Sequence, residues 1–509
     1  MKKFFVTALA VMFTMGVTAA KKVPAKLQFD PSKGVAGSVT MPQGDIVNYT
    51  AFTKLYFVTN VEDSTYQYMN VFVPAGATQQ SPIFLRTYIG GYMAAQASFP
   101  QGGDATGRAL KEGYVVVIPG SRGRGSIVQK GKKTIYTGRA PKGLLDLKAA
   151  VRYLRLFDKV MSGDAEKIIT DGTSAGGAMS SLVGATGNNL AYDKYLKAMG
   201  AADTRDDVFA SVCYCPITDL DHADMAYEWL YGGTTSRQQA DDAHKTVSGE
   251  LAQLFPAYIN SLNLKKSDGS ALNADNYLDD IKSEIIRSAQ IAKNAGADIP
   301  DSIGFTFSQG GGFGMPPLNS GKFGPKGKQG GMMPPAGMRD KKPEGMPPMM
   351  RGGGKQVGEY ITDLDMPKYL NYVVSTQPLK SAPAFDAKGV ASNTATGENE
   401  EFGDETGSSV NFTDYSATKN QVAVTPEVRE AVRLLNPMYF IGDSQTTVAP
   451  HWYIRHGARD RDTAFPIAIN LATKLQNAGK DVNFLLAWNR PHSGDYALDE
   501  LFAWIKTLK

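Results

Sequence analysis

The chain has 509 residues, a formal net charge of +4 and 42% hydrophobic residues, and it contains only two cysteines. A chain of this length can bury a large core, so its fold needs no disulfide framework. The charges are nearly balanced and form no long run of one sign, which argues against a nucleic-acid partner. Cys213 and Cys215 fall on a predicted buried strand, and we expect them to remain unbridged.

The N-terminus has the pattern of a targeting segment. A short basic region, Lys2 and Lys3, precedes an apolar run over residues 4–17, and small residues follow this run. The run is shorter than a typical membrane span and leads into a cleavable sequence. We therefore predict a signal peptide over residues 1–20, no stable membrane span after its removal, and export to the bacterial periplasm, the cell surface or the medium.

Strand and helix patterns alternate along much of the chain. Short apolar runs predict strands, and longer segments with a helical apolar period predict helices. This alternation is typical of an α/β fold with a mostly parallel central sheet and helices on both faces. The predicted strands cover residues 67–73, 82–88, 114–118, 167–170, 208–212, 450–455 and 482–488, and the predicted helices cover residues 144–157, 277–295 and 465–479.

The alternating pattern stops after Pro216 and resumes at Pro450. We predict a lid domain over residues 222–436, inserted between the sixth and seventh strands of a domain that residues 21–221 and 437–509 form. Within the insertion, residues 309–354 are biased to glycine, proline and methionine. Such a tract cannot bury enough apolar area to offset its chain entropy, so we expect it to be mobile. A methionine surface for aromatic ligands is the alternative.

Ser174 is the strongest candidate for a catalytic residue. It is the centre of Gly172-Thr173-Ser174-Ala175-Gly176, directly after a predicted strand and before a helical run of small residues. In this setting a Gly-x-Ser-x-Gly segment forms a sharp turn that lifts the serine hydroxyl above the sheet, as in α/β-hydrolases. A glycine-rich turn without chemistry is the alternative, but acid and base candidates downstream favour a nucleophile.

The acid and the base are expected at the ends of the last two strands of the sheet. In α/β-hydrolases the triad follows the chain order nucleophile, acid, base. Asp460 follows the penultimate predicted strand, and His492 follows the last one. We therefore predict that His492 takes the proton of Ser174 and that Asp460 orients His492.

Three further residues lie close to this pair in the sequence, and each has a different expected role. Asp462 is the rival acid, and we expect it to contact the substrate if Asp460 is the acid. His456 precedes the acid and is expected to pack within the loop. Asp495 is expected to start the terminal helix, because acidic residues favour the first turn.

Two backbone N–H groups are candidates for an oxyanion hole. The N–H of Ala175 directly follows the nucleophile, and we assign the second donor to Gly91, with Tyr92 as the alternative. The glycine–arginine loop at residues 120–125 lacks the Gly-Lys-Ser/Thr ending of a phosphate loop, so we expect a structural loop there.

The chain resembles the bacterial tannases, the galloyl esterases of the α/β-hydrolase superfamily, from about residue 85 to the C-terminus. In that family the nucleophile, acid and base match Ser174, Asp460 and His492, in agreement with the chain order. Thr173 and Pro491 stand where the fungal branch of tannases and feruloyl esterases has cysteines, so that branch does not fit. The matching segments are residues 172–177, 214–220, 223–224, 227–229, 383–386, 398–399, 402–403, 455–457, 460–463 and 491–495.

The resemblance also implies how the acyl group is recognised. A gallate ring carries three adjacent hydroxyls, and the positions that match the family's ring contacts are Lys380, Glu398 and Asp462. Buried polar groups left without partners would penalise a ring that lacks those hydroxyls. The segment between Lys380 and Glu398 is longer than the family suggests, so Glu400 or Glu401 is the alternative to Glu398.

The sequence thus predicts an exported serine esterase that releases gallate from a small-molecule galloyl ester or tannin, with an acyl-enzyme on Ser174 and without a cofactor or metal. A feruloyl or general phenolic esterase, or a prolyl-peptidase-like hydrolase of the same fold, is the first alternative. A non-catalytic polyphenol-binding protein is the alternative from another class, and the intact Ser174, Asp460 and His492 argue against it.

Overall fold

The structure is a computed structural model that describes residues 26–309 and 359–508. The predicted signal peptide and residues 310–354 of the tract rich in glycine, proline and methionine lie outside the described residues. No helix in the described part of the chain is both long enough and apolar enough to cross a membrane.

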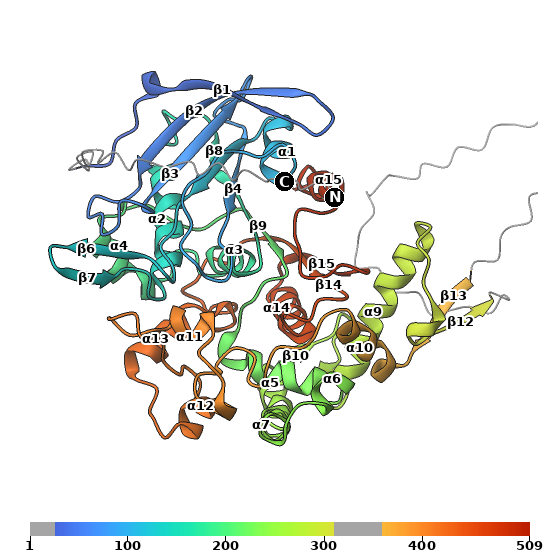
Figure 1. Cartoon of the computed structure of the whole chain (residues 1–509). Coiled ribbons are helices and arrows are strands. Elements are labelled where there is room, and N and C mark those ends of the chain that lie inside the picture. Colours follow the sequence, from blue (N-terminus) through green and yellow to red (C-terminus); the bar gives the residue numbers. More distant parts are fainter. Residues whose placement is uncertain (1–25, 310–358, 509) are drawn as a thin grey trace, which may run out of the picture.

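Nine strands form one mixed sheet, as predicted for an α/β-hydrolase (Figure 1). Their order in the sheet is β1-β2-β3-β5-β4-β8-β9-β14-β15. The pairs from β1 to β5 are antiparallel, and all pairs from β5 to β15 are parallel. The strands are β1 (Val35–Thr40), β2 (Ile46–Tyr56), β3 (Tyr68–Pro74), β4 (Pro82–Thr87), β5 (Val115–Pro119), β8 (Asp164–Thr173), β9 (Ala210–Tyr214), β14 (His451–Gly457) and β15 (Asp481–Ala487).

The two faces of the sheet pack against separate apolar clusters. On β5, Val115 and Val117 join one cluster and Val116 and Ile118 join the other, because successive side chains of a strand point to opposite faces. Helices α2 (Lys142–Leu156), α3 (Ala175–Ala185) and α14 (Phe465–Asn477) contribute to the first cluster, and α1 (Ala105–Lys111) and α15 (Leu498–Ile505) contribute to the second.

The N-terminal hairpin of β1 and β2 is absent from the prediction. Most of its side chains are exposed or half-buried, so the segment shows no continuous apolar run. Five predicted strands and these two precede the insertion, which therefore lies between the seventh and eighth strands of the sheet, β9 and β14, rather than between the sixth and seventh.

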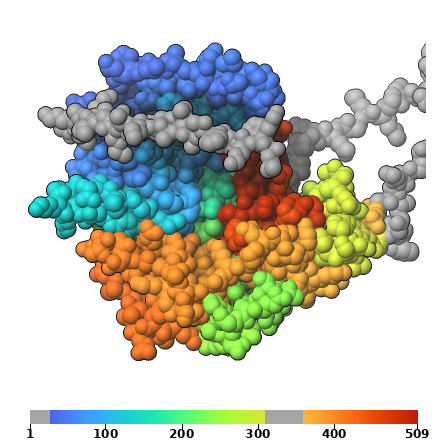
Figure 2. Space-filling view, in the orientation of Figure 1, coloured from blue at the N-terminus to red at the C-terminus, as the bar shows by residue number. Residues whose placement is uncertain are grey.

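Among the described residues, none between β9 and β14 adds a strand to the main sheet. This part of the chain, coloured green to orange, forms the lower portion of the molecule in Figures 1 and 2. Its boundaries at residues 222 and 436 and its action as a lid remain predictions. It contains α5 (Leu220–Tyr231), α6 (Thr235–Gln238), α7 (Asp242–Ala252), α8 (Phe255–Ser261), α9 (Tyr277–Asn294), α10 (Met366–Ser375), α11 (Gly397–Glu401), α12 (Asp414–Lys419), α13 (Pro426–Leu434) and two small hairpins, β10 (Leu264–Lys265) with β11 (Ala271–Leu272) and β12 (Phe305–Gln309) with β13 (Glu359–Leu364).

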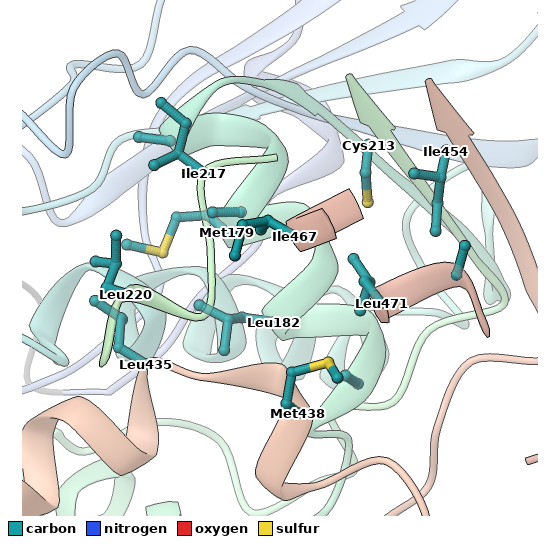
Figure 3. Close-up of a cluster of buried hydrophobic side chains, with 14 of the residues drawn as sticks. Met179, Leu182, Cys213, Ile217, Leu220, Leu435, Met438, Ile454, Ile467 and Leu471 are labelled. Atoms are coloured by element: carbon teal, nitrogen blue, oxygen red, sulfur yellow. The ribbon is translucent and has the colours of Figure 1, made fainter. Parts of the chain in front are cut away.

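The inserted segment shares a core with the sheet. Leu435 and Met438 belong to the same buried cluster as Met179 and Leu182 of α3, which Figure 3 shows. All four side chains are at most 4% exposed. Because the insertion is packed into this common core, its loops can be held at fixed positions above the ends of the strands.

Candidate active site

Ser174 lies in a sharp turn between β8 and α3. Its backbone angles are φ 62° and ψ −125°, a strained region for a residue with a side chain, and its side chain is half-buried. A Cβ on Gly172 would lie 2.2 Å from the Gly176 oxygen, and one on Gly177 would lie 2.6 Å from the Tyr214 oxygen. The turn therefore requires glycine at these places, which is the geometry that exposes a nucleophile.

Asp460 and His492 form a hydrogen-bonded pair at the ends of β14 and β15. The Oδ2 atom of Asp460 lies 2.7 Å from Nδ1 of His492, and its Oδ1 atom accepts the N–H of Asp462 at 2.8 Å. Burial alone would raise the pKa of the Asp460 carboxyl, but His456 and His492 lower it below its ordinary value, so the carboxylate is charged. Nε2 of His492 is buried and has no hydrogen-bond partner among the described residues.

The loop that carries His492 packs directly on the Ser174 turn. A Cβ on Gly494 would lie 1.9 Å from Oγ1 of Thr173, and Sγ of Cys215 lies 3.4 Å from the carbonyl oxygen of Ser493. Ser174 Oγ makes no hydrogen bond to His492 in the described structure. Catalytic hydrogen bonds are often long or poorly aligned in enzymes without substrate and tighten when the substrate binds.

His456 and Asp462, the two neighbours of the Asp460–His492 pair, lie in different environments. His456 is fully buried and its Nε2 lies 3.7 Å from Asp460 Oδ2; burial holds the pKa of His456 below its ordinary value. Asp462 is half-buried and pairs with Arg461 at 2.6 Å, although its carboxylate also lies within 4.8 Å of the nearest ligand atoms of Asp460 and His492. Only Asp460 makes the bond to the base that an orienting acid requires.

The pH dependence of the reaction should report the Asp460–His492 pair. Burial alone would lower the pKa of His492, but the hydrogen bond and charge of Asp460 raise it above its ordinary value of 6.5. Because only the neutral ring can accept the serine proton, kcat/KM should fall as the pH drops through this pKa. Asp460→Asn is expected to move the acidic limb to lower pH and to reduce kcat about 10⁴-fold.

The pH–rate profiles of the wild type, Asp460→Asn and the matched variant Asp462→Asn decide between the two acids. Asp462→Asn should leave most of the raised pKa in place, because Asp460 still holds Nδ1. A larger displacement of the acidic limb in Asp462→Asn than in Asp460→Asn would show that Asp462, and not Asp460, orients His492.

The candidate oxyanion loop is a tight turn after β4. The N–H of Met93 donates to the Gly90 oxygen at 3.0 Å, and both central residues have positive φ, 54° at Gly91 and 58° at Tyr92. Within the described part of the chain, neither central N–H donates a hydrogen bond to a protein acceptor. Both remain free, together with the N–H of Ala175 at the start of α3, for an oxyanion.

The residues expected to bind the ring lie around the same site. Lys380 Nζ lies 4.2 Å from the ring centroid of Phe385 and has no ion-pair partner among the described residues, and its charge acts to lower the pKa of His492. Among the three candidate glutamates, Glu400 pairs with Arg124 at 3.1 Å and Glu401 is fully buried. Glu398 is half-buried and near Tyr92, and no described side chain or backbone group bonds its carboxylate. These assignments remain predictions.

Helix α5 is a scaffold that the sequence analysis missed. Asp224 accepts the N–H groups of residues 384–386 at 2.7–2.9 Å, and the hydroxyl of Tyr227 donates to the Arg461 oxygen at 2.7 Å. Tyr231 donates to the Asp460 oxygen at 2.9 Å. The spacing of 224, 227 and 231 places the three side chains on one helical face. Polar residues at these spacings within a buried helix were the sequence pattern that could have indicated this scaffold.

Asp495 does not start the terminal helix, contrary to the expectation from sequence, but binds Arg86. Asp495 lies outside α15 at φ 53°, and its carboxylate accepts two hydrogen bonds from Arg86, at 2.7 and 3.1 Å. Arg86 also donates to Asp171 on β8. One buried guanidinium therefore joins the strand before the oxyanion loop, the strand before Ser174 and the loop after His492.

Breaking this bridge should disturb the base more than the fold. Asp495→Asn keeps the shape of the side chain but weakens its bond to Arg86, so the loop that carries His492 is held less firmly. A displacement of His492 by a fraction of an ångström would impair proton transfer from Ser174. We expect kcat to fall roughly 10- to 100-fold with a small change in KM. Asp499→Asn, which breaks the exposed pair with Arg108, is the matched control. Equal kcat values for the two variants would show that the bridge has no positioning role.

Three groups of described residues bring metal-type ligand atoms within 4.8 Å of one another. One of them is the candidate triad region itself, and a metal there would compete with the bond between Asp460 and His492. The chemistry expected of Ser174 needs no metal or cofactor, and this absence remains a prediction. The groups are Cys215, His456 and Asp460; Asp219, Asp221 and His222; and Asp460, Asp462 and His492.

Comparison with known proteins shows the family to which the chain belongs. A family model described as BD-FAE matches residues 69–254. No curated protein matches the chain. The Fusobacterium nucleatum tannase structure is 32% identical with a TM-score of 0.77, and the match covers 95% of this chain and 100% of that one.

Two further solved structures match over almost the same span. The tannase from Lactobacillus plantarum, in an orthorhombic crystal, is 33% identical with a TM-score of 0.77 and coverage of 94% of this chain and 99% of that chain. A tannin acyl hydrolase in complex with ethyl gallate is 33% identical with a TM-score of 0.76 and coverage of 94% and 98%. Such identity over nearly the whole of both chains shows that this chain belongs to the bacterial tannase family of α/β-hydrolases and is a carboxylic ester hydrolase.

Proposed function

We propose that this protein hydrolyses galloyl esters and releases gallate through an acyl-enzyme on Ser174. The observation that carries the proposal is the Asp460–His492 pair beside the Ser174 turn, with Lys380 close enough to influence His492. The solved complex of a related tannin acyl hydrolase with ethyl gallate supports a galloyl substrate.

In the proposed reaction, His492 Nε2 takes the proton of Ser174 as its hydroxyl attacks the ester carbonyl. The N–H groups of Ala175 and the Gly91 turn stabilise the negative oxygen, and the alcohol leaves with the proton from His492. Water then attacks the galloyl-serine ester by the same route and frees gallate. Lys380, Glu398 and Asp462 are proposed to bind the ring hydroxyls during both steps.

Relative turnover of methyl gallate and methyl ferulate tests the substrate. The ferulate ring carries one hydroxyl and one methoxy group in place of the three adjacent hydroxyls of gallate, which would leave polar groups of the site without partners. We therefore expect kcat/KM to be at least about 100-fold higher for methyl gallate than for methyl ferulate. A preference for ferulate would favour the phenolic-esterase alternative. Failure of a fluorophosphonate probe to label Ser174 would instead favour a binding protein.

We also propose export of the protein. The proposal is supported by the basic, apolar and small-residue order of residues 1–20. Fractionation of cells that express the full chain, with N-terminal sequencing of the mature protein, tests it. Retention of residues 1–20 in a cytoplasmic protein would rule it out.

A further inference from the structure

Arg124 belongs to the glycine–arginine loop at residues 120–125, which was expected to be a structural loop. The loop packs on the oxyanion turn: a Cβ on Gly123 would lie 2.5 Å from the Tyr92 oxygen. Backbone bonds run in both directions, from the Arg124 N–H to the Tyr92 oxygen at 2.9 Å and from the Ala94 N–H to the Arg124 oxygen at 3.1 Å. The glycine is therefore needed for close contact between the two loops.

The Arg124 side chain joins this turn to helix α11. Its Nε donates to the carbonyl oxygen of Gly91, and its Nη1 lies 3.1 Å from Oε2 of Glu400. The guanidinium lies against the first residue of the helix, because a Cβ on Gly397 would be 2.9 Å from its Cζ. The side chain is 25% exposed, so water screens its charge only in part.

The bond to Gly91 acts on a peptide group of the oxyanion turn. The carbonyl of Gly91 and the N–H of Tyr92 belong to the same peptide unit, and a cationic donor on the oxygen polarises the N–H at its other side. The bond also fixes the plane of that unit, whereas the Gly91 N–H belongs to the preceding unit, whose Gly90 oxygen accepts the N–H of Met93 at 3.0 Å. The Tyr92 N–H, one of the two candidate donors of the turn, therefore depends directly on Arg124.

We propose that Arg124 is a positioning residue that fixes the Gly91–Tyr92 peptide for oxyanion stabilisation and ties it to α11, the helix that carries Glu398. This inference rests on the proposed function. It predicts that Arg124 affects every ester the enzyme cleaves, whereas Glu398 affects only those with ring hydroxyls.

The test compares Arg124→Gln, Glu398→Gln and Glu400→Gln on methyl gallate and p-nitrophenyl acetate. Arg124→Gln should lower kcat roughly 10- to 100-fold on both substrates with KM changed less than about threefold, because the loss falls on the transition state. Glu398→Gln should impair methyl gallate alone. Glu400→Gln leaves the bond to Gly91 intact, so its turnover of the acetyl ester should stay within about twofold of wild type.

Arg429→Gln is the matched control, because it also breaks an arginine–carboxylate pair, with Asp414, but at the exposed surface. If Arg124→Gln loses its thermal transition, Arg124→Lys replaces it, since one ammonium cannot reproduce the forked contacts to Gly91 and Glu400. Unchanged kcat on both substrates, or a loss confined to methyl gallate, would overturn the proposal. If the wild type shows no preference for methyl gallate, the proposed substrate fails, but the acetyl-ester result still decides the role of Arg124.

Discussion

Ser174→Ala is expected to lower kcat on methyl gallate roughly 10⁴- to 10⁶-fold, with KM changed only a few-fold. The hydroxyl is the atom that forms the acyl bond, and the strained turn between β8 and α3 presents this side chain beside the His492 loop. Steady-state kinetics measure the loss. Mass spectrometry after treatment with a fluorophosphonate should find the adduct on the wild type and not on the variant.

Ser493→Ala is the matched control for this prediction. The Ser493 hydroxyl lies in the same region and bonds the Pro491 oxygen at 3.1 Å, so its removal costs one local hydrogen bond. We expect less than about a tenfold loss of kcat and normal fluorophosphonate labelling. If Ser174→Ala kept activity comparable to that of Ser493→Ala, the nucleophile would have to be another group.

The sheet could be predicted from sequence wherever strands are buried on both faces. The apolar residues 115–118 predict β5 because no polar side chain interrupts them, whereas the exposed β1 and β2 carry no such run. The turn at Ser174 was predictable because its whole pattern lies within residues 172–176, and a Cβ on Gly172 would meet the oxygen of Gly176 within that pattern. Local geometry leaves a local pattern.

Contacts between distant segments left no such pattern. Arg86 and Asp495 are 409 positions apart, and nothing near either residue indicates the other as its partner. Chain order led to Asp460 and His492 because the α/β-hydrolase topology brings the ends of neighbouring parallel strands together, and those two residues follow the paired strands β14 and β15. The topology thus supplied the long-range information that residue patterns lacked.

The three glutamates of α11 show the same limit at short range. Glu398, Glu400 and Glu401 differ only in helical phase, so the sequence alone could not separate them. The fold places Glu401 in the interior, where burial raises the pKa of its carboxyl well above the ordinary value, and pairs Glu400 with Arg124. No described group bonds the carboxylate of Glu398 or that of Glu401, but Glu398 is half-buried and Glu401 is fully buried.

Lys380→Ala is expected to lower kcat/KM for methyl gallate roughly 10- to 100-fold, the cost of about 1.5–3 kcal/mol for a lost hydrogen bond to a charged group. Turnover of p-nitrophenyl acetate should change less than about threefold, since an acetyl group presents no hydroxyl to the ammonium. Asp462→Ala should show the same selectivity. Steady-state kinetics on both esters give the comparison.

The exposed Lys368 on α10 provides the matched control for this selectivity. Lys368→Ala removes the same charge near the protein surface and should leave both esters unaffected. Equal losses of gallate and acetate turnover in Lys380→Ala would mean that the lysine acts on His492 or on the fold. A loss confined to the gallate ester would place the ammonium at the ring of the acyl group, because the acetyl group has no ring.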